Sequence, residues 1–407
     1  MEKIHLLLLV FAALAILAAG CTQPTEEHRP APVGSQVTIT VPVPPVPVQS
    51  RDGTNLAYEL ELLAAGDEVF TPETVEVIDP DTSKVIYILD DALLASLYHP
   101  AADPLPSAAE LQNGTGKLPV PRISLWFVVD PDAVPDRLVH RVTLNMSGSG
   151  KPPLTLTGGQ VAVRKDLSPV VVGSPMRGPG WLALETTAPN THHFSAQITM
   201  GGVTRVPQKY AQDWIYVDPV TGKAVEGDPG LARNYYGFGK EILSVANGTV
   251  VDMLDGLPDH ERIYSPQGVT IATAAGNYVI VDIGDGKYAC YAHMVNGSVR
   301  VVPGDRVIEG QVLGLMGNSG NSDLPHLHFQ VVEEKASFLG AEGYPHVYRA
   351  FDVTGEVNQT RGMEIATDPD FTNEKLWSEF DTLVSFYPKP VHQQESLPEN
   401  WVILDLP

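Results

Sequence analysis

The strongest constraint on the fold is the recurrence of short runs in which apolar and polar residues alternate. In residues 56–62 the large apolar side chains of Leu56, Tyr58, Leu60 and Leu62 fall on every second position, which is the period of a half-buried β-strand. Long apolar stripes with the helical period are scarce. Turn signals separate further runs of this kind at residues 75–78, 85–89, 123–129, 138–146 and 154–163. The sequence therefore predicts a mostly β protein.

These alternating runs predict an immunoglobulin-like β-sandwich over residues 51–170, because five or more short strands follow one another at the spacing of such folds. His140 lies in the middle of one run, between Val139 and Arg141, and is interpreted as a structural histidine. No residues in this domain suggest a reaction. Its role stays open between a spacer and a surface that binds a partner or a wall polymer.

The first 21 residues have the pattern of a signal segment. Lys3 precedes an unbroken apolar run over residues 6–17, which is too short to span a bilayer comfortably, and small residues then precede Cys21. The string before Cys21 resembles a lipoprotein signal-peptidase site. We therefore expect a lipoprotein, anchored to the outer face of the membrane through a lipidated Cys21. Plain secretion after cleavage and an uncleaved anchor are the alternatives.

Residues 22–50 are expected to form a Pro-rich linker. Four of the six residues at 42–47 are prolines, and such a stretch is extended and semi-rigid. This linker is interpreted as a spacer that holds the folded part away from the membrane, with a strand at residues 37–41 as the alternative.

Charge and cysteine content exclude two classes of partner or site. The formal net charge is −23, and an acidic surface repels phosphate backbones, so no nucleic-acid partner is expected. The two cysteines are Cys21 and Cys290. With Cys21 lipidated, no intrachain disulfide and no Cys-rich zinc site can form, and Cys290 is expected to be buried and inert.

Two segments in the second half of the chain place histidines on predicted strands. His326 and His328 are two residues apart, so on a strand they point to the same side. This arrangement suits one metal ligand and one catalytic neighbour. His293 ends the run 288–293, where Tyr291 and His293 are expected to share one face of a strand and His293 to reach into a neighbouring pocket.

Two earlier segments supply further metal-binding residue types. Asp213 lies in an apolar and aromatic run, where a carboxylate is costly unless it is paired or bound to a cation. His192 and His193 are adjacent; on a strand they would point to opposite sides, so that at most one faces a shared metal. Hydrolytic zinc sites use three protein ligands plus water, and one of these two histidines with Asp213 and His328 would complete such a set.

Residues 235–332 resemble the lysostaphin/LytM-type zinc endopeptidases, whose fold is the duplicated hybrid motif. Residues 239–251 resemble a hairpin of that family, residues 276–281 its next strand, and residues 302–314 the hairpin that closes the barrel. The specific features are the His-Leu-His-Phe segment at 326–329 and the Tyr-Ala-His segment upstream of it. All of these occur in the family's order.

The resemblance implies a peptidase domain over residues 171–407, with its core at 190–335 and the remaining C-terminal residues wrapping back onto it. It implies that His328 binds zinc, that His326 is catalytic and that His293 acts on the transition state. The family's other two ligands come as His-x-x-x-Asp. Asp213 matches the aspartate, whereas Lys209 stands at the histidine position. We expect an adjoining strand to supply the missing imidazole, with His193 as first choice and His192 as second.

The function that follows is an exported metalloendopeptidase with one Zn²⁺ per chain, which hydrolyses amide bonds in cell-wall peptides or short Gly- or Ala-rich peptides. The alternative is a degenerate relative that binds or activates another envelope hydrolase, and a third reading is an adhesive or polymer-binding lipoprotein. Retention of His293, His326 and His328 together favours the enzyme. No feature noted in the sequence indicates the oligomeric state.

Overall fold

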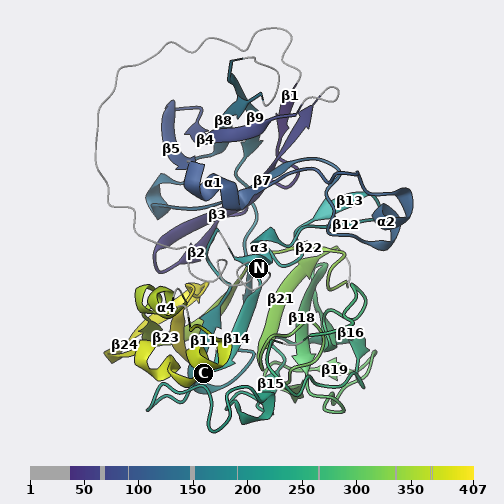
Figure 1. The fold of residues 1–407 in the computed structure, drawn as a ribbon, viewed down its shortest axis with the longest axis vertical. Coiled ribbons are helices and arrows are strands. Elements are labelled where there is room, and N and C mark those ends of the chain that lie inside the picture. Colours follow the sequence, from purple (N-terminus) through teal and green to yellow (C-terminus); the bar gives the residue numbers. More distant parts are fainter. Residues whose placement is uncertain are drawn as a thin grey trace.

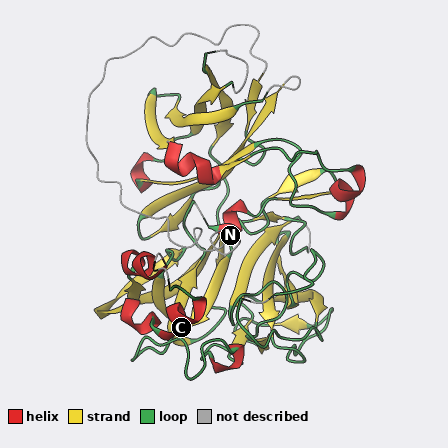
Figure 2. Ribbon diagram, in the orientation of Figure 1, coloured by secondary structure: helices red, strands yellow, loops and turns green. Residues whose placement is uncertain are grey.

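The computed structural model describes residues 37–64, 69–89, 91–146, 152–189, 191–264, 266–334, 337–366, 368 and 370–407. The expected signal segment and Cys21 lie outside the described residues, so the lipoprotein anchor stays a prediction. Within the described ranges, no helix is long and apolar enough to cross a membrane. Strands dominate the described chain, and the helices are short (Figure 2), as the alternating sequence pattern predicts.

The N-terminal half is a sandwich of two antiparallel sheets, drawn in purple and blue in Figure 1. One sheet has the order β1-β3-β7-β6, with β2 paired to β3, and the other has the order β5-β4-β8-β9. Leu60 and Val77, from opposite sheets, lie in one buried core. The strands of the sandwich are β1 (Val37–Thr40), β2 (Val48–Ser50), β3 (Gly53–Ala64), β4 (Thr71–Asp79), β5 (Lys84–Leu89), β6 (Tyr98–His99), β7 (Arg122–Val129), β8 (Arg137–Asn145) and β9 (Leu154–Ala162). The finer, immunoglobulin-like assignment stays a prediction.

The sandwich begins earlier than expected. Residues 37–50, expected within the Pro-rich linker, instead contain β1 and β2, which both pair with β3. Val46 and Val48 are buried. The alternation of Val37, Ile39 and Val41 supports a strand whose apolar side chains enter the sandwich core, and this local pattern outweighs the prolines that follow it.

The second half is built on one large sheet of order β10-β23-β25-β11-β14-β21-β18-β17-β16-β19, with β22 paired to β21 and β24 to β23. The C-terminal strands, yellow in Figure 1, extend this sheet beside β11: β25 pairs with β11 and with β23. The strands are β10 (Val170–Val172), β11 (Gly178–Leu184), β14 (Gln212–Tyr216), β16 (Gly248–Leu254), β17 (Asn277–Gly284), β18 (Lys287–Met294), β19 (Arg306–Val307), β21 (Leu327–Glu333), β22 (Glu342–Gly343), β23 (His346–Val357), β24 (Val384–Ser396) and β25 (Val402–Leu406).

Two small sheets and several short helices complete the described chain. The small sheets pair β12 (Ile198–Met200) with β13 (Val203–Arg205), and β15 (Glu241–Leu243) with β20 (Val312–Leu315). The helices are α1 (Asp91–Leu97), α2 (Ala108–Asn113), η1 (Pro131–Ala133), α3 (His192–Ser195), η2 (Ala232–Asn234), α4 (Gln359–Ala366), α5 (Asn373–Ser378) and η3 (Phe380–Leu383).

The two faces of the large sheet have different roles. Leu327, Phe329 and Val331 of β21 point into the main core of the domain, so the alternating residues His328 and Gln330 point to the opposite face. That opposite face also carries Asp213 from β14, which pairs with His328 in register. The sheet therefore presents the predicted site residues from two neighbouring strands on one face.

The two halves meet at a buried interface beside this face. Figure 1 shows α3 between the sandwich and the large sheet, and Phe194 of α3 packs edge-on against Trp126 of β7, with ring centroids 5.3 Å apart. Lys209, 2% exposed, forms ion pairs with Glu59 of the sandwich at 2.9 Å and with Glu342 at 2.7 Å. One ammonium between two buried carboxylates thus ties both halves to the segment that leads into β14.

Candidate metal centre

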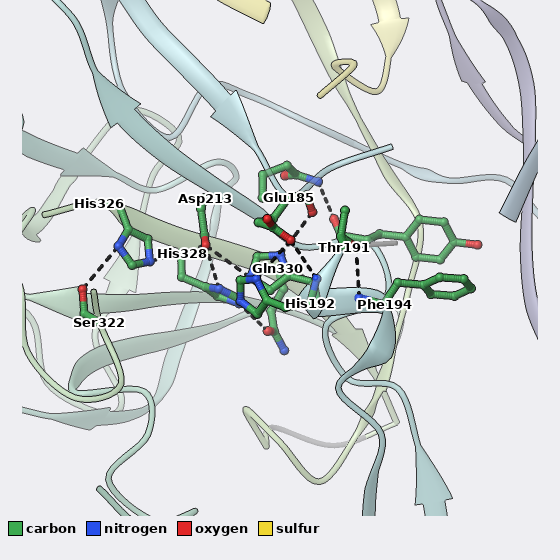
Figure 3. A network of polar contacts seen from close by, with 12 residues as sticks. Glu185, Thr191, His192, Phe194, Asp213, Ser322, His326, His328 and Gln330 are labelled. Atoms are coloured by element: carbon green, nitrogen blue, oxygen red, sulfur yellow. Dashed lines mark hydrogen bonds and ion pairs between the residues drawn. The ribbon is translucent and has the colours of Figure 1, made fainter. Parts of the chain in front are cut away.

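The centre of the site is the carboxylate of Asp213, which three imidazole rings surround (Figure 3). Oδ1 of Asp213 lies 2.9 Å from Nδ1 of His328, 3.4 Å from Nε2 of His193 and 3.4 Å from Nε2 of His326. The side chain of Asp213 is 13% exposed. Although burial favours the neutral acid, the neighbouring His193 and His326 outweigh that effect and hold the pKa of Asp213 well below its usual range.

His193 reaches the site from α3, not from a strand. Thr191 caps α3 by accepting a hydrogen bond from the backbone N–H of Phe194 at 3.2 Å. The helical turn buries His193, whereas the side chain of His192 is 55% exposed and pairs with Glu185 at 3.0 Å. The prediction of a strand here is wrong, because the Thr191 cap favours a helical turn. The structure directs the buried His193 at Asp213, and the exposed His192 lies beside it, with ligand atoms of all three residues within 4.8 Å of one another.

His293 enters the site because its backbone adopts an unusual conformation. Its φ is +62°, and the pairing of β17 with β18 shifts register between Asn277 and Val279. Tyr291 packs against Phe329 in the core, whereas His293 groups with His326 and His328, their ligand atoms lying within 4.8 Å of one another. The expectation that Tyr291 and His293 share one face is therefore wrong: the irregularity turns the ring of His293 to the other side.

Backbone carbonyls fix three of the four rings. Nδ1 of His293 lies 2.8 Å from the carbonyl of Ser319, Nδ1 of His326 lies 2.7 Å from that of Leu324, and Nδ1 of His193 lies 3.2 Å from that of Glu185. A carbonyl oxygen only accepts, so each of these nitrogens carries the proton and each ring presents a bare Nε2. Burial, with His326 and His328 nearby, holds the pKa of His293 well below its ordinary value, which keeps that ring neutral.

Two glycines allow the Ser319 carbonyl to reach His293. Gly276 and Gly320 both have positive φ, and a Cβ at either position would collide with backbone of the facing segment. A side chain at either would push the loop 317–322 away from the start of β17. Oγ of Ser319 then accepts from the backbone N–H of Asn277 at 3.0 Å and donates to the carbonyl of Met294 at 2.7 Å, which secures the loop.

The donor set fits a bound cation. Nε2 of His193 is buried and has no hydrogen-bond partner among the described residues, although it faces a carboxylate. The unprotonated Nε2 atoms of His193 and His326 converge on Oδ1 of Asp213 with no proton between them. Burying several hydrogen-bond acceptors together is costly unless they bind one cation. Borderline-soft divalent ions with a preference for imidazole and carboxylate ligands suit this set.

The structure brings together every residue that the sequence singled out: His193, Asp213, His293, His326 and His328. Sequence reasoning missed Glu185, whose carbonyl orients His193, and Gln330, whose Oε1 lies 2.8 Å from Nε2 of His328. Gln330 lies two residues beyond His328 on one strand face, which is the signal that could have identified it. No comparable pattern marks Glu185, because the contact uses its backbone.

Cys290 takes no part in the site. It is fully buried beside Ile280, Val332 and Ala341, and burial raises the pKa of its thiol well above the ordinary value. A neutral thiol of this kind is a poor nucleophile, which agrees with the expectation that Cys290 is inert.

Comparison with known proteins identifies part of this chain. Over 90 residues, 21% of this chain, the sequence is 36% identical to the peptidoglycan DD-endopeptidase ShyA of Vibrio cholerae serotype O1, and the match covers 20% of that protein. It is 35% identical over 94 residues to endolysin 2638A of Staphylococcus phage 2638A, covering 22% of this chain and 16% of the endolysin. The match thus spans about a fifth of the length of these curated relatives.

Among solved structures, the catalytic domain of lysostaphin from Staphylococcus simulans is 24% identical, with 30% of this chain and 86% of that chain covered and a TM-score of 0.20. A zinc-containing peptidase from Vibrio cholerae is 11% identical, with 71% of this chain and 80% of that chain covered and a TM-score of 0.19. The model of peptidase family M23 matches residues 236–338. That segment holds His293, His326 and His328, and this match confirms the resemblance drawn from the sequence: the chain carries a peptidase family M23 domain.

Proposed function

We propose that this protein is a zinc-dependent endopeptidase that hydrolyses amide bonds in the peptides of the cell wall. One observation carries the proposal: bare imidazole nitrogens converge on the buried carboxylate of Asp213, and Nε2 of His193 has no partner among the described residues. The family M23 domain and the similarity to a peptidoglycan DD-endopeptidase support the substrate class.

The ligands are Nε2 of His193, the carboxylate of Asp213 and Nδ1 of His328. Two histidines and one carboxylate, with a position left for water, form a set that catalytic zinc sites use. Bound zinc supplies Lewis acidity, which polarises a carbonyl and lowers the pKa of water to about 7. His193 replaces the imidazole that the family's His-x-x-x-Asp pattern would place at residue 209, where Lys209 instead holds Glu59 and Glu342.

His293 and His326 are the catalytic residues. Each donates its Nδ1 proton to a backbone carbonyl, so each presents an unprotonated Nε2 to the site. Either nitrogen can therefore accept the proton of the attacking water and pass it to the departing amine. As the C–O bond forms, the protonated ring stabilises the developing oxyanion by a hydrogen bond. It then gives its proton to the amine nitrogen as the C–N bond of the amide breaks.

The substrate is a short peptide or cell-wall polymer, with Gly- or Ala-rich crosslinks as the preferred class. The protein acts outside the cell, held to the outer face of the membrane by a lipidated Cys21 or, without that lipid, secreted. The net charge of −23 repels phosphate-rich polymers and is compatible with a peptide substrate.

Elemental mass spectrometry of the purified protein tests the metal site. We expect about one zinc per chain, lost in the His193→Ala, Asp213→Ala and His328→Ala variants and retained in His192→Ala, the matched control with an exposed side chain. His293→Ala and His326→Ala should retain zinc but release no peptide fragments from purified cell walls. A folded wild-type protein that takes up no added zinc refutes the proposal and favours a regulator of another hydrolase.

A further inference from the structure

Gln330 lies between His328 and the segment 337–341, and its amide contacts both. It is 1% exposed. Its Oε1 lies 2.8 Å from Nε2 of His328, and its Nε2 donates to the carbonyl of Phe338 at 2.8 Å. Figure 3 shows Gln330 beside His328, on the side of the ring away from Asp213. Both ends of the amide are thus engaged in the interior.

The Phe338 carbonyl determines which way the amide faces. A carbonyl oxygen only accepts, so the NH₂ group of Gln330 must point to Phe338 and its oxygen to His328. Nε2 of His328 must then carry a proton, because the amide oxygen also only accepts. Nδ1 of His328 is left bare, and it lies 2.9 Å from Oδ1 of Asp213. The Phe338 carbonyl thus determines, through the amide of Gln330, which nitrogen of His328 carries the proton.

The position of His328 in the sheet explains why its Nε2 contacts a side chain, Gln330, and not a backbone carbonyl. His193, His293 and His326 donate directly to backbone carbonyls. β21 instead lies between β14 and β18 and pairs with both, so the carbonyls around His328 belong to the ladders. A glutamine two residues along the same face is long enough to bring its amide oxygen to Nε2 of His328.

The segment that orients Gln330 is itself fixed. The ring of Phe338 lies against the ring of His328, with centroids 5.3 Å apart, and near Tyr278 at 6.4 Å. Ala341 is buried with Ile280 and Cys290 in a small core on the same sheet face. The carbonyl of Phe338 therefore has a fixed position, from which it orients the side-chain amide of Gln330.

We propose that Gln330 is a positioning residue of the metal centre: anchored by the Phe338 carbonyl, it holds His328 in the tautomer whose Nδ1 is free to bind the metal. This inference rests on the proposed function, because the metal gives the bare Nδ1 its role. Partners of this kind behind a ligand histidine alter metal affinity by about 10–100-fold.

The test compares Gln330→Met and Gln330→Glu in the full chain. Methionine keeps the length but removes both polar groups, whereas glutamate keeps an acceptor for Nε2 of His328 and loses the donor to Phe338. Zinc affinity is measured by competition with a chromophoric chelator. We expect Gln330→Met to bind zinc about 10–100-fold more weakly, and Gln330→Glu to stay within about threefold of wild type because the carboxylate restores the acceptor.

Gln212→Met is the matched control. Gln212 is also a buried glutamine, but its Oε1 accepts from Tyr348 at 2.7 Å and from His346 at 2.9 Å, in the core on the other face of the sheet. Its loss should lower thermal stability and leave zinc affinity within about threefold of wild type, as expected for a substitution that leaves the ligand tautomer intact. Equal loss of affinity in Gln212→Met and Gln330→Met would mean that general destabilisation causes the effect, and would overturn the inference.

A second readout separates this inference from the proposed function. Nitrogen-15 NMR of the metal-free protein reports which nitrogen of His328 carries the proton, without any zinc or activity. We expect the Nε2–H tautomer in wild type and in Gln330→Glu, and a mixture of tautomers in Gln330→Met. An unchanged tautomer in Gln330→Met refutes the positioning role, whereas a wild type with the Nε2–H tautomer that binds no zinc refutes the proposed function alone.

Discussion

Substitution of Lys209 by methionine should destabilise the junction between the two halves of the protein. The Lys209 side chain is 2% exposed, and its partners Glu59 and Glu342 are 1% and 8% exposed. Without the ammonium, two carboxylates face each other in the interior with no cation between them. Removing one partner of a buried ion pair costs about 3–5 kcal/mol, so we expect the free energy of unfolding to fall by about that amount.

The loss of stability in Lys209→Met should increase as pH rises. Burial raises the pKa of Glu342 above its ordinary 4.5, and Lys209 opposes that rise; in Lys209→Met the opposition is gone. A carboxyl whose folded pKa exceeds its unfolded value contributes stability that is fully present below the unfolded pKa and is lost as pH rises through the folded one. The variant should therefore approach wild-type stability near pH 4.5 and diverge from it toward pH 7.

Chemical denaturation at a series of pH values measures both effects. Lys117→Met is the control, because the Lys117–Glu110 pair is exposed at 48% and 38% and an ion pair of this kind contributes little to stability. Adding Glu59→Gln and Glu342→Gln to Lys209→Met removes the buried charges and should recover much of the loss. A Lys209→Met protein that loses less than about 1 kcal/mol at pH 7, with no pH dependence, would refute the reasoning, since a buried pair costs more than that to break.

Three further predictions concern other buried groups. Burial lowers the pKa of His140 from 6.5 to about 4, so as pH falls the unfolded chain takes up a proton before the folded protein does. At about 1.4 kcal/mol per pH unit, the free energy of unfolding should drop by about 3 kcal/mol between pH 6.5 and 4. Equilibrium denaturation of His140→Gln should show no such drop. Cys290 is fully buried, so thiol reagents should label it only at the rate of unfolding, and fast labelling of native protein would contradict its burial. Zinc at about 1,000 times its Kd stabilises a folded protein by about 4 kcal/mol, so a chelator should lower the melting temperature of wild type but leave Asp213→Asn unchanged in calorimetry.

The strands could be predicted from the sequence because their signal is local. Leu56 to Leu62 alternate within seven residues, and β3 (Gly53–Ala64) contains them all. The pair His326 and His328 is equally local, since two residues on one strand face share a side whatever the partner strands are. The match of residues 236–338 to family M23 confirms the interpretation that those motifs supported.

Features that depend on backbone irregularity or on distant contacts could not be predicted. The positive φ of His293 reverses the face that strand alternation assigns to it. The Thr191 cap makes a helical turn where the neighbouring histidines suggested a strand. Lys209 pairs with Glu59, which lies 150 positions earlier in the chain, and no local pattern announces such a partner.

The sequence by itself determined the supply of residue types: β-strands from period-two alternation, and His193, Asp213, His293, His326 and His328 as the candidate ligands and bases. Only the tertiary structure decided which nitrogen of each ring faces Asp213, because that choice depends on acceptors from other segments. Carbonyls of Glu185, Ser319 and Leu324, and Gln330 for His328, occupy the opposite nitrogens. The sequence specifies which residues are present, whereas the acceptors that folding brings to each imidazole ring decide which of its nitrogens keeps a free lone pair.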